Sequence, residues 1–127
     1  MKNSIRLQIR YGDLDTLGHV NNAVFLTYFE LGRIEFLKLV SEKFDPAKVG
    51  IVIAHAEIDY KRPLFIQDDP VLDTEVERIG NKSITFLSTI RDKYGEMCTQ
   101  GRVIAVCIDQ SGRTISVPES WKKIFLS

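Results

Sequence analysis

The 127-residue sequence has few of the residues that bridge or ligate a small fold. Its 2 cysteines, Cys98 and Cys107, fall within one expected strand, where pairing within the chain has poor geometry. There is no C-x-x-C pair and no disulfide framework. The 2 histidines, His19 and His55, lie far apart without the spacing of metal ligands. We therefore expect a reducing, cytoplasmic setting, no metal and no cofactor.

Neither positive nor negative charge is in excess, and no long apolar run is present. The 17 basic residues balance the 17 acidic ones, so no net field draws the chain to nucleic acid or to a membrane. Little self-repulsion then opposes association between copies. No apolar stretch approaches the length of a membrane span, and the N-terminal MKNSIRLQIRYGD is too polar for a signal peptide. The sequence predicts neither a nucleic-acid nor a membrane partner.

Signature motifs of several enzyme classes are also missing. No G-x-G-x-x-G or Walker pattern occurs, which argues against a phosphate-binding loop. No G-x-S-x-G elbow occurs, which argues against a serine-triad esterase. We find no linker, repeat or low-complexity tract, and the length suggests one domain over residues 1–127.

Hydrophobic periodicity, by contrast, is clear in the first third of the chain. Residues 4–11 alternate apolar and polar, which predicts a strand. From Asn22 to about Ser41 the apolar residues cover more than one stripe, which predicts a helix largely enclosed by protein. Within it Gly32 indicates a close backbone contact, and Glu30 and Arg33 have the spacing of an ion pair.

The rest of the chain has the period of β-strands. The expected strands, separated by turn signals, cover residues 51–64, 71–79, 82–92 and 97–109. Gly80-Asn81 predicts a hairpin turn, Gly101 a bulge, and Pro118 the start of a short C-terminal helix. One antiparallel sheet must then cover one very apolar helix, which is an α+β architecture.

The strand over residues 51–64 has two different faces. One face carries apolar or small residues that suit packing on the helix: Val52, Ala54, Ala56, Ile58 and Tyr60. The other carries His55, Glu57 and Asp59, which we interpret as a solvated or oligomer-packed outer face rather than a site.

Residues 11–33, YGDLDTLGHVNNAVFLTYFELGR, resemble the opening motif of the hotdog-fold acyl-CoA thioesterases, most closely the 4-hydroxybenzoyl-CoA thioesterase-like branch. The matching positions are Asp13, Asp15, Gly18, Val20, Asn21, Asn22, Tyr28, Phe29, Glu30 and Arg33. The resemblance implies a hotdog fold, in which an antiparallel sheet wraps a long central helix. It also implies hydrolysis of thioesters of coenzyme A or of acyl carrier protein, and homodimers that join sheets edge to edge and often pair into tetramers. The active sites of the family lie at the dimer interface.

The same resemblance assigns the catalytic carboxylate to Asp15, either as nucleophile or as general base for water. The substrate carbonyl would be held by the backbone N–H of Asn22, where free amides and the helix dipole favour developing negative charge. His19 would orient substrate or water, or simply pack the loop. Asp13 is expected to bond loop amides. The structural alternatives are that Asp15 is a turn residue and that Asn21 or Asn22 only caps the helix.

Substrate contacts are expected from four further residues. NKSITF resembles a family segment that contacts the nucleotide of coenzyme A, which implies Lys82 and Ser83. Arg62 is a candidate by charge alone, and Phe25 would line the acyl pocket. Exposed lysines in a hairpin are more often simple surface. The alternative function is a non-catalytic acyl-thioester binding protein of the same fold. Dehydration chemistry matches the loop poorly, and the acyl group is left open.

Overall fold

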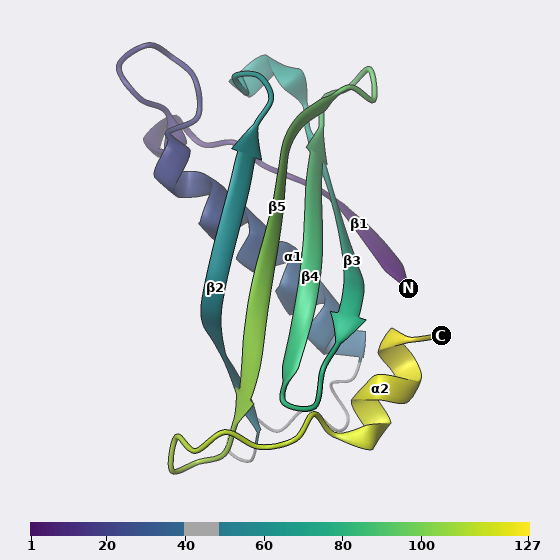
Figure 1. Ribbon diagram of the computed structural model, residues 1–127. Helices are drawn as coiled ribbons and strands as arrows, with labels where there is room; N and C mark the ends of the chain where they lie inside the picture. Colours follow the sequence, from purple (N-terminus) through teal and green to yellow (C-terminus); the bar gives the residue numbers. More distant parts are fainter. Residues whose placement is uncertain (40–48) are drawn as a thin grey trace.

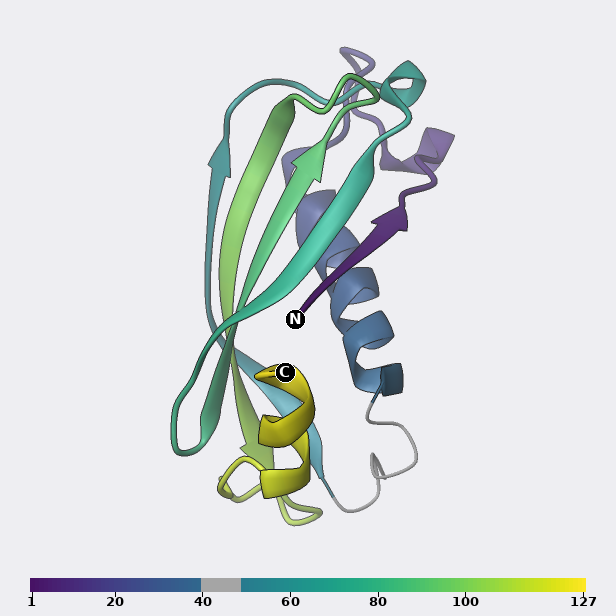
Figure 2. The same ribbon diagram turned by 90° about the vertical axis from the view of Figure 1, so that its right-hand side faces the viewer.

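The computed structural model describes residues 1–39 and 49–127. One sheet in the order β1-β3-β4-β5-β2, antiparallel throughout, curves around a long helix (Figures 1 and 2). The strands are β1 (Lys2–Arg6), β2 (Gly50–Tyr60), β3 (Val71–Ile79), β4 (Ser83–Arg91) and β5 (Met97–Ile108). The helices are α1 (Phe25–Leu39) and α2 (Glu119–Phe125), with 3-10 turns η1 (Tyr11–Asp13), η2 (Asn22–Val24) and η3 (Ile66–Asp68). The expected α+β arrangement is confirmed.

The first strand and the long helix differ from their expected bounds. β1 ends at Arg6, where the amide of Leu7 donates to the carbonyl of Pro70 at 3.0 Å and the chain leaves the sheet. The helix begins through η2, and its expected end near Ser41 lies outside the described residues. Strand alternation continues beyond Arg6 because Leu7 and Ile9 still point into the core, so a period of two does not by itself imply sheet pairing.

Helix α1 lies close to the sheet because two glycines remove side chains at the contact. A Cβ on Gly32 would overlap the Thr74 hydroxyl, so the predicted close contact is confirmed. At Gly101 the ring of Phe29 occupies the space of a Cβ. The pairing of Gly101 continues without a register shift, so the predicted bulge there is wrong. Glycine at this position serves packing rather than backbone irregularity.

The far side of α1 is open in the single chain. Leu26, Leu31 and Ile34 are 40–45 % exposed, so the helix is less enclosed than its apolar sequence suggests. Within the described residues Glu30 and Arg33 do not form the predicted ion pair, and Nη1 of Arg33 is buried without a hydrogen-bond partner. Burial lowers the pKa of Arg33, and the charge of Glu30 only partly offsets this effect.

Strand β2 forms one edge of the sheet and pairs only with β5. Its register shifts between Ile53 and His55, and this bulge changes which residues face inward. Ile51 and Ile58 both pack against core clusters, although one is odd-numbered and the other even. Val52 is 45 % exposed, so the predicted apolar face that began at this residue is wrong before the bulge.

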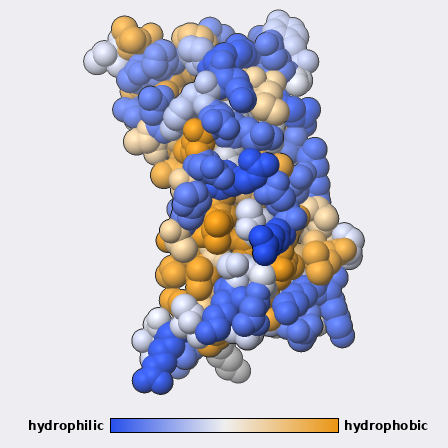
Figure 3. Space-filling model, viewed as in Figure 1, coloured by the Kyte–Doolittle hydropathy of each residue, from blue (hydrophilic) through white to orange (hydrophobic). Residues whose placement is uncertain are grey.

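The outer face of the sheet is mostly polar. His55, Glu57 and Asp59 are exposed on it, in agreement with the solvated face predicted for them. Figure 3 shows this side of the molecule, where hydrophilic residues cover most of the surface and hydrophobic ones gather near its middle. No helix among the described residues is long and apolar enough to cross a membrane.

The interior divides into two hydrophobic clusters along the sheet. The loop-end core consists of Leu7, Ile9, Val20, Phe25, Tyr28, Phe29, Leu64, Leu72, Ile90, Cys98 and Val103. The hairpin-end core consists of Phe36, Ile84, Phe86, Ala105, Cys107, Val117, Trp121 and Phe125. Helix α2 closes the second of these (Figure 2). Cys98 and Cys107 are buried and free, one in each core, so they do not pair.

Candidate active site

The loop between β1 and α1 is anchored by Asp13. Its buried carboxylate accepts hydrogen bonds from the Tyr28 hydroxyl at 2.8 Å and the Arg10 amide at 3.0 Å. Its carbonyl accepts from the amide of Asn21 at 2.9 Å, just before the helix starts. Burial alone would raise the pKa of Asp13, but these donors outweigh it and hold the pKa below its usual value. The predicted role of Asp13 in bonding loop amides is confirmed.

Asp15 lies two residues further on and contacts His19. Its Oδ2 is 2.9 Å from Nδ1 of His19, and both side chains are 27 % exposed. Its Oδ1 accepts from the amide of Leu17 at 2.9 Å, and its own amide donates to the His19 carbonyl at 2.9 Å. This geometry meets the requirements of a turn residue. It also occupies Nδ1 of the imidazole, which leaves Nε2 available to bind a ligand or to accept a proton.

The start of the helix has the free donor that an anion would need. Asn21 caps η2, and its side chain accepts from the amide of Ala23 at 3.0 Å. Within the described residues the amide of Asn22 donates to no acceptor, whereas its carbonyl accepts from the Tyr60 hydroxyl at 3.0 Å. The capping expected of Asn21 is confirmed, and the Asn22 amide stays available at the positive end of the helix dipole.

A cavity of about 240 Å³ opens beside Asn22. Two segments line it. The first runs from the loop into α1 and the second from the end of β2 onward, with residues His19, Val20, Asn22, Phe25, Tyr60, Lys61, Arg62, Pro63 and Leu64. The ring of Phe25 packs edge-on against Tyr60, with centroids 5.4 Å apart. Of the described residues in this wall, His19 is the one that contacts Asp15. The cavity therefore brings together the imidazole of His19, the residue with the free amide, the guanidinium of Arg62 and aromatic rings.

The predicted site residues fall into two groups in the single chain. His19, Asn22, Phe25 and Arg62 line the one cavity, with Asp15 behind His19. Lys82 and Ser83 lie at the β3–β4 hairpin, where the Lys82 carbonyl accepts from the amide of Cys107 at 3.0 Å. That hairpin is at the opposite end of the sheet from the cavity (Figure 1).

Sequence reasoning missed two contributors to this region. Tyr60 was expected only to pack on the helix, but its hydroxyl bonds the Asn22 carbonyl. Asp92 was not considered at all, although its buried carboxylate holds Arg62. The turn sequence DKYGE signals Asp92 as a turn residue, but nothing in the sequence signals its distant partner. Among the described residues, no group of three or more His, Cys, Asp and Glu side chains is placed to hold a metal ion.

Comparisons with known proteins agree on one family. The sequence model of the thioesterase-like superfamily matches residues 9–125. A putative acyl-CoA thioesterase, YneP of Bacillus subtilis, is 25 % identical over 107 residues, covering 82 % of this chain and 78 % of that protein.

Two solved structures are similar over nearly the whole chain. A thioesterase of Thermus thermophilus, complexed with coenzyme A and Zn, is 30 % identical at a TM-score of 0.83 and covers 96 % of this chain and 90 % of its own. A predicted thioesterase of Bacillus stearothermophilus is 28 % identical at a TM-score of 0.88, covering 99 % and 95 %.

Proposed function

The chain belongs to the thioesterase-like superfamily, and we propose that it hydrolyses acyl-CoA thioesters at the cavity where α1 begins. The expected family, the hotdog fold and the class of thioester hydrolase are confirmed by this membership and by the similar structures. The observation that carries the proposed site is the cavity itself, because it brings His19 and the free amide of Asn22 together.

The Asn22 amide supplies the oxyanion site in this proposal. A thioester oxygen directed at it would also lie at the positive end of the α1 dipole, where negative charge is stabilised. Removal of one such donor typically slows acyl transfer on the order of 10²- to 10³-fold. Because the donor belongs to the backbone, a side-chain substitution at Asn22 leaves it in place.

The Asp15–His19 pair supplies the attack on the acyl carbon. In one route Asp15 is the nucleophile, and water then hydrolyses the acyl-enzyme anhydride; in another it is the general base that deprotonates water. The 2.9 Å contact to Nδ1 adds a third route, in which Asp15 orients His19 and Nε2 takes the proton from water. In every route the C–S bond breaks and CoA leaves as a thiol after protonation.

We propose further that the active unit is a homo-oligomer. The outer edge of β2 has no partner strand in the described sheet, and Val52 and Ile53 on it are each 45 % exposed. An uncovered edge of 11 residues is a liability that proteins normally cover. A second copy that pairs its β2 antiparallel across a two-fold axis would cover both edges at once.

Such a dimer would also account for the distant substrate residues. Antiparallel pairing places the start of one β2 beside the end of the other, and the β3–β4 hairpin lies at the start-of-β2 end of the sheet. Lys82 and Ser83 of the partner subunit would then lie at the end where this chain has its cavity. Arg62 and the partner subunit's Lys82 would meet the phosphates of coenzyme A, and Phe25 the acyl group. Pairing of dimers into tetramers stays a prediction.

The second candidate function is a non-catalytic acyl-thioester binder. It is favoured by one observation: both oxygens of Asp15 already have partners within the loop, as a purely structural turn residue would. The thioesterase and the binder would use the same cavity, but only the thioesterase would hydrolyse the bound thioester.

Release of free thiol from short, medium, long and aromatic acyl-CoAs tests the proposal and identifies the acyl class together. We expect release from at least one class at a rate proportional to enzyme concentration. Saturable binding of every class without any thiol release would favour the binder instead. The native mass in solution tests the oligomer separately, because a monomer at working concentration would leave the partner's hairpin out of the site.

A further inference from the structure

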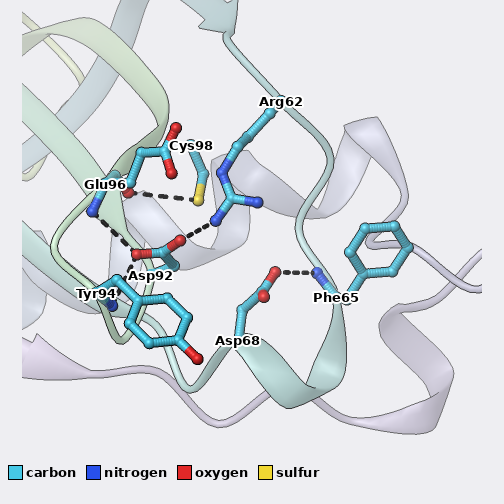
Figure 4. Close-up of polar contacts among 7 residues, drawn as sticks. All are labelled: Arg62, Phe65, Asp68, Asp92, Tyr94, Glu96 and Cys98. Atoms are coloured by element: carbon cyan, nitrogen blue, oxygen red, sulfur yellow. Dashed lines mark hydrogen bonds and ion pairs between the residues drawn. The ribbon is translucent and has the colours of Figure 1, made fainter.

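The wall of the cavity opposite the helix start is held by a buried ion pair. Arg62 follows β2 and donates through Nη2 to Oδ2 of Asp92, which lies in the turn between β4 and β5 (Figure 4). The side chain of Asp92 is 3 % exposed and that of Arg62 is 31 % exposed, because Arg62 also lines the cavity. The pair therefore links the interior of the turn to the surface of the site.

The turn alone does not explain this carboxylate. Oδ1 of Asp92 already accepts from the amides of Tyr94 and Glu96, each at 2.9 Å, and these bonds close the turn. Oδ2 is left for Arg62, which is 30 residues away in the chain. Burial would raise the pKa of Asp92, but the two amides and the guanidinium hold it below its usual value, so the carboxylate stays charged against Arg62.

The segment from Arg62 to Phe65 connects this ion pair to His19. The amides of Lys61 and Arg62 both donate to the Cys98 carbonyl, at 2.8 and 3.1 Å. At the other end the Leu64 carbonyl accepts from the amide of Val20 at 2.8 Å.

Phe65 completes the connection. It forms a bridge with His19, and the rings of the two residues meet edge-on with centroids 6.2 Å apart. The position of His19 therefore depends on a wall that is fastened at Asp92.

We propose that Asp92 is a positioning residue for the thioester site, acting through Arg62 on the cavity wall and on His19. The effect of Asp92 on turnover rests on the proposed function, whereas its effect on the position of His19 does not. The Nε of Arg62 is buried without a hydrogen-bond partner among the described residues, so this nitrogen does not hold the side chain in place. Loss of Asp92 would remove the hydrogen-bond partner of Nη2 and leave the guanidinium to the weaker attraction of Asp68 and Glu96. The guanidinium would then shift, and the Leu64–Phe65 segment would lose its fixed spacing from His19.

The chain offers a matched control for the test. Asp73 is another buried carboxylate paired with an arginine, Arg91, at 2.7 Å, and it also accepts from the hydroxyl of Ser4. It joins β1, β3 and β4 and does not line the cavity. Asp92→Asn and Asp73→Asn therefore make the same chemical change at a buried carboxylate paired with arginine, and only the first bonds a residue that lines the site.

The first readout needs no turnover. The two histidines are His19 at the site and His55 on the exposed outer face, so imidazole NMR signals carry their own internal reference. We expect Asp92→Asn to move the His19 signals and leave those of His55 in place, while Asp73→Asn moves neither. Equal behaviour of the two variants at His19 would overturn the proposal, whether or not the protein hydrolyses thioesters.

The second readout is kinetic and uses the acyl-CoA that the wild-type protein cleaves. Misplacement of a site wall predicts a loss in kcat/KM of about 10- to 100-fold for Asp92→Asn. Asp73→Asn should stay within about twofold, because Asp73 and its partner Arg91 do not line the cavity. Arg62→Lys, which does not disturb the turn, should share the defect, and the double variant should be no worse than the poorer single one. Additive losses would contradict an action of Asp92 through Arg62.

Discussion

The loop-end and hairpin-end cores are built from similar apolar residues but differ in the polar groups packed around them. The loop-end core surrounds the Asp13–Tyr28 hydrogen bond and adjoins the Arg62–Asp92 ion pair and the cavity. The hairpin-end core is closed by aromatic packing, with Phe36, Trp121 and Phe125 in edge-to-face contact at 5.8–6.2 Å. The loop-end core thus adjoins paired charged groups and the cavity of the proposed site, whereas aromatic rings close the hairpin-end core.

This difference indicates that the loop end serves activity and the hairpin end serves stability. Buried charges are costly unless they are paired, so the hydrogen-bonded Asp13 and the Arg62–Asp92 pair beside the loop-end core indicate a site that requires a fixed geometry. Aromatic packing without charge contributes stability and little else. Substitutions at the loop end should therefore change activity more than stability, and those at the hairpin end should do the reverse.

The sharpest test of this contrast is Asp15→Asn. An amide cannot act as nucleophile or base, so we expect kcat/KM to fall on the order of 10³-fold, within the range of lost acid–base catalysis. The amide oxygen can still accept from Leu17, so the midpoint of thermal unfolding should hardly change. Steady-state thiol release and a thermal melt on one preparation measure both. Wild-type rates from a pure Asp15→Asn sample would exclude Asp15 from the chemistry.

The reverse behaviour is expected of Phe125→Ala in α2. The ring is 1 % exposed and packs against Phe36 and Trp121, so its loss should cost about 3–5 kcal/mol of unfolding free energy. Urea denaturation measures this loss. The kcat/KM of the remaining folded protein should match wild type, because the cavity lies at the other end. A large loss of kcat/KM without loss of stability would remove the distinction between the two ends.

Gly32→Ala tests the contact that brings helix and sheet together between the cores. The new methyl would overlap the Thr74 hydroxyl and approach Leu72 Cδ2 at 2.9 Å. Such overpacking should cost about 1–3 kcal/mol in urea denaturation, against the usual gain of alanine over glycine in a helix. A more stable Gly32→Ala protein would show that the helix does not approach the sheet so closely.

An effect no larger than that of Gly32→Ala is expected of Tyr28→Phe, which removes one donor from buried Asp13. At neutral pH we expect a loss of about 1–3 kcal/mol, because the carboxylate keeps its charge with one partner fewer. The folded-state pKa of Asp13 is lowered, so its contribution to stability is present above its unfolded value of about 4 and is lost as pH falls through the folded value.

That sign gives the Tyr28 prediction a pH dependence. The gap in unfolding free energy between wild type and Tyr28→Phe should be widest near pH 7 and should narrow as pH falls through the lowered folded-state pKa of Asp13, because the protonated carboxyl no longer depends on the Tyr28 donor. Denaturation curves at several pH values measure the gap. Tyr60→Phe is the control, because its hydroxyl bonds a carbonyl and no carboxylate, so its gap should stay constant with pH.

Local sequence patterns predicted the elements well and their pairing less well. The strand period located β3, β4 and β5, and Gly32 announced the close helix contact. The phase of β2 could not be predicted, because a bulge reverses alternation without any local signal at Ile53. Gly101 was misinterpreted because glycine occurs in strands both at bulges and where a distant ring packs against the backbone. The sequence alone does not distinguish these two cases.

The candidate site shows the same limit. The loop motif indicated Asp15, His19 and Asn22 as candidates, which are close in the chain, and the contact between Asp15 and His19 lies within the loop. The pairing of Arg62 with Asp92 could not be predicted, because hydrogen bonds to amides of its own turn are enough to explain an aspartate at position 92. Arg62 and Asp92 are 30 residues apart, and they meet because β5 pairs with both β2 and β4 in a register that the sequence does not state.

The most direct measurement is a crystal structure with a non-hydrolysable ketone analogue of the acyl-CoA that is cleaved best. The proposed site predicts the ketone oxygen within about 3.2 Å of the Asn22 amide, with the Asp15–His19 pair facing the carbonyl carbon. An analogue bound with its carbonyl away from that amide, or on the far side of the sheet from His19, would contradict the proposed site.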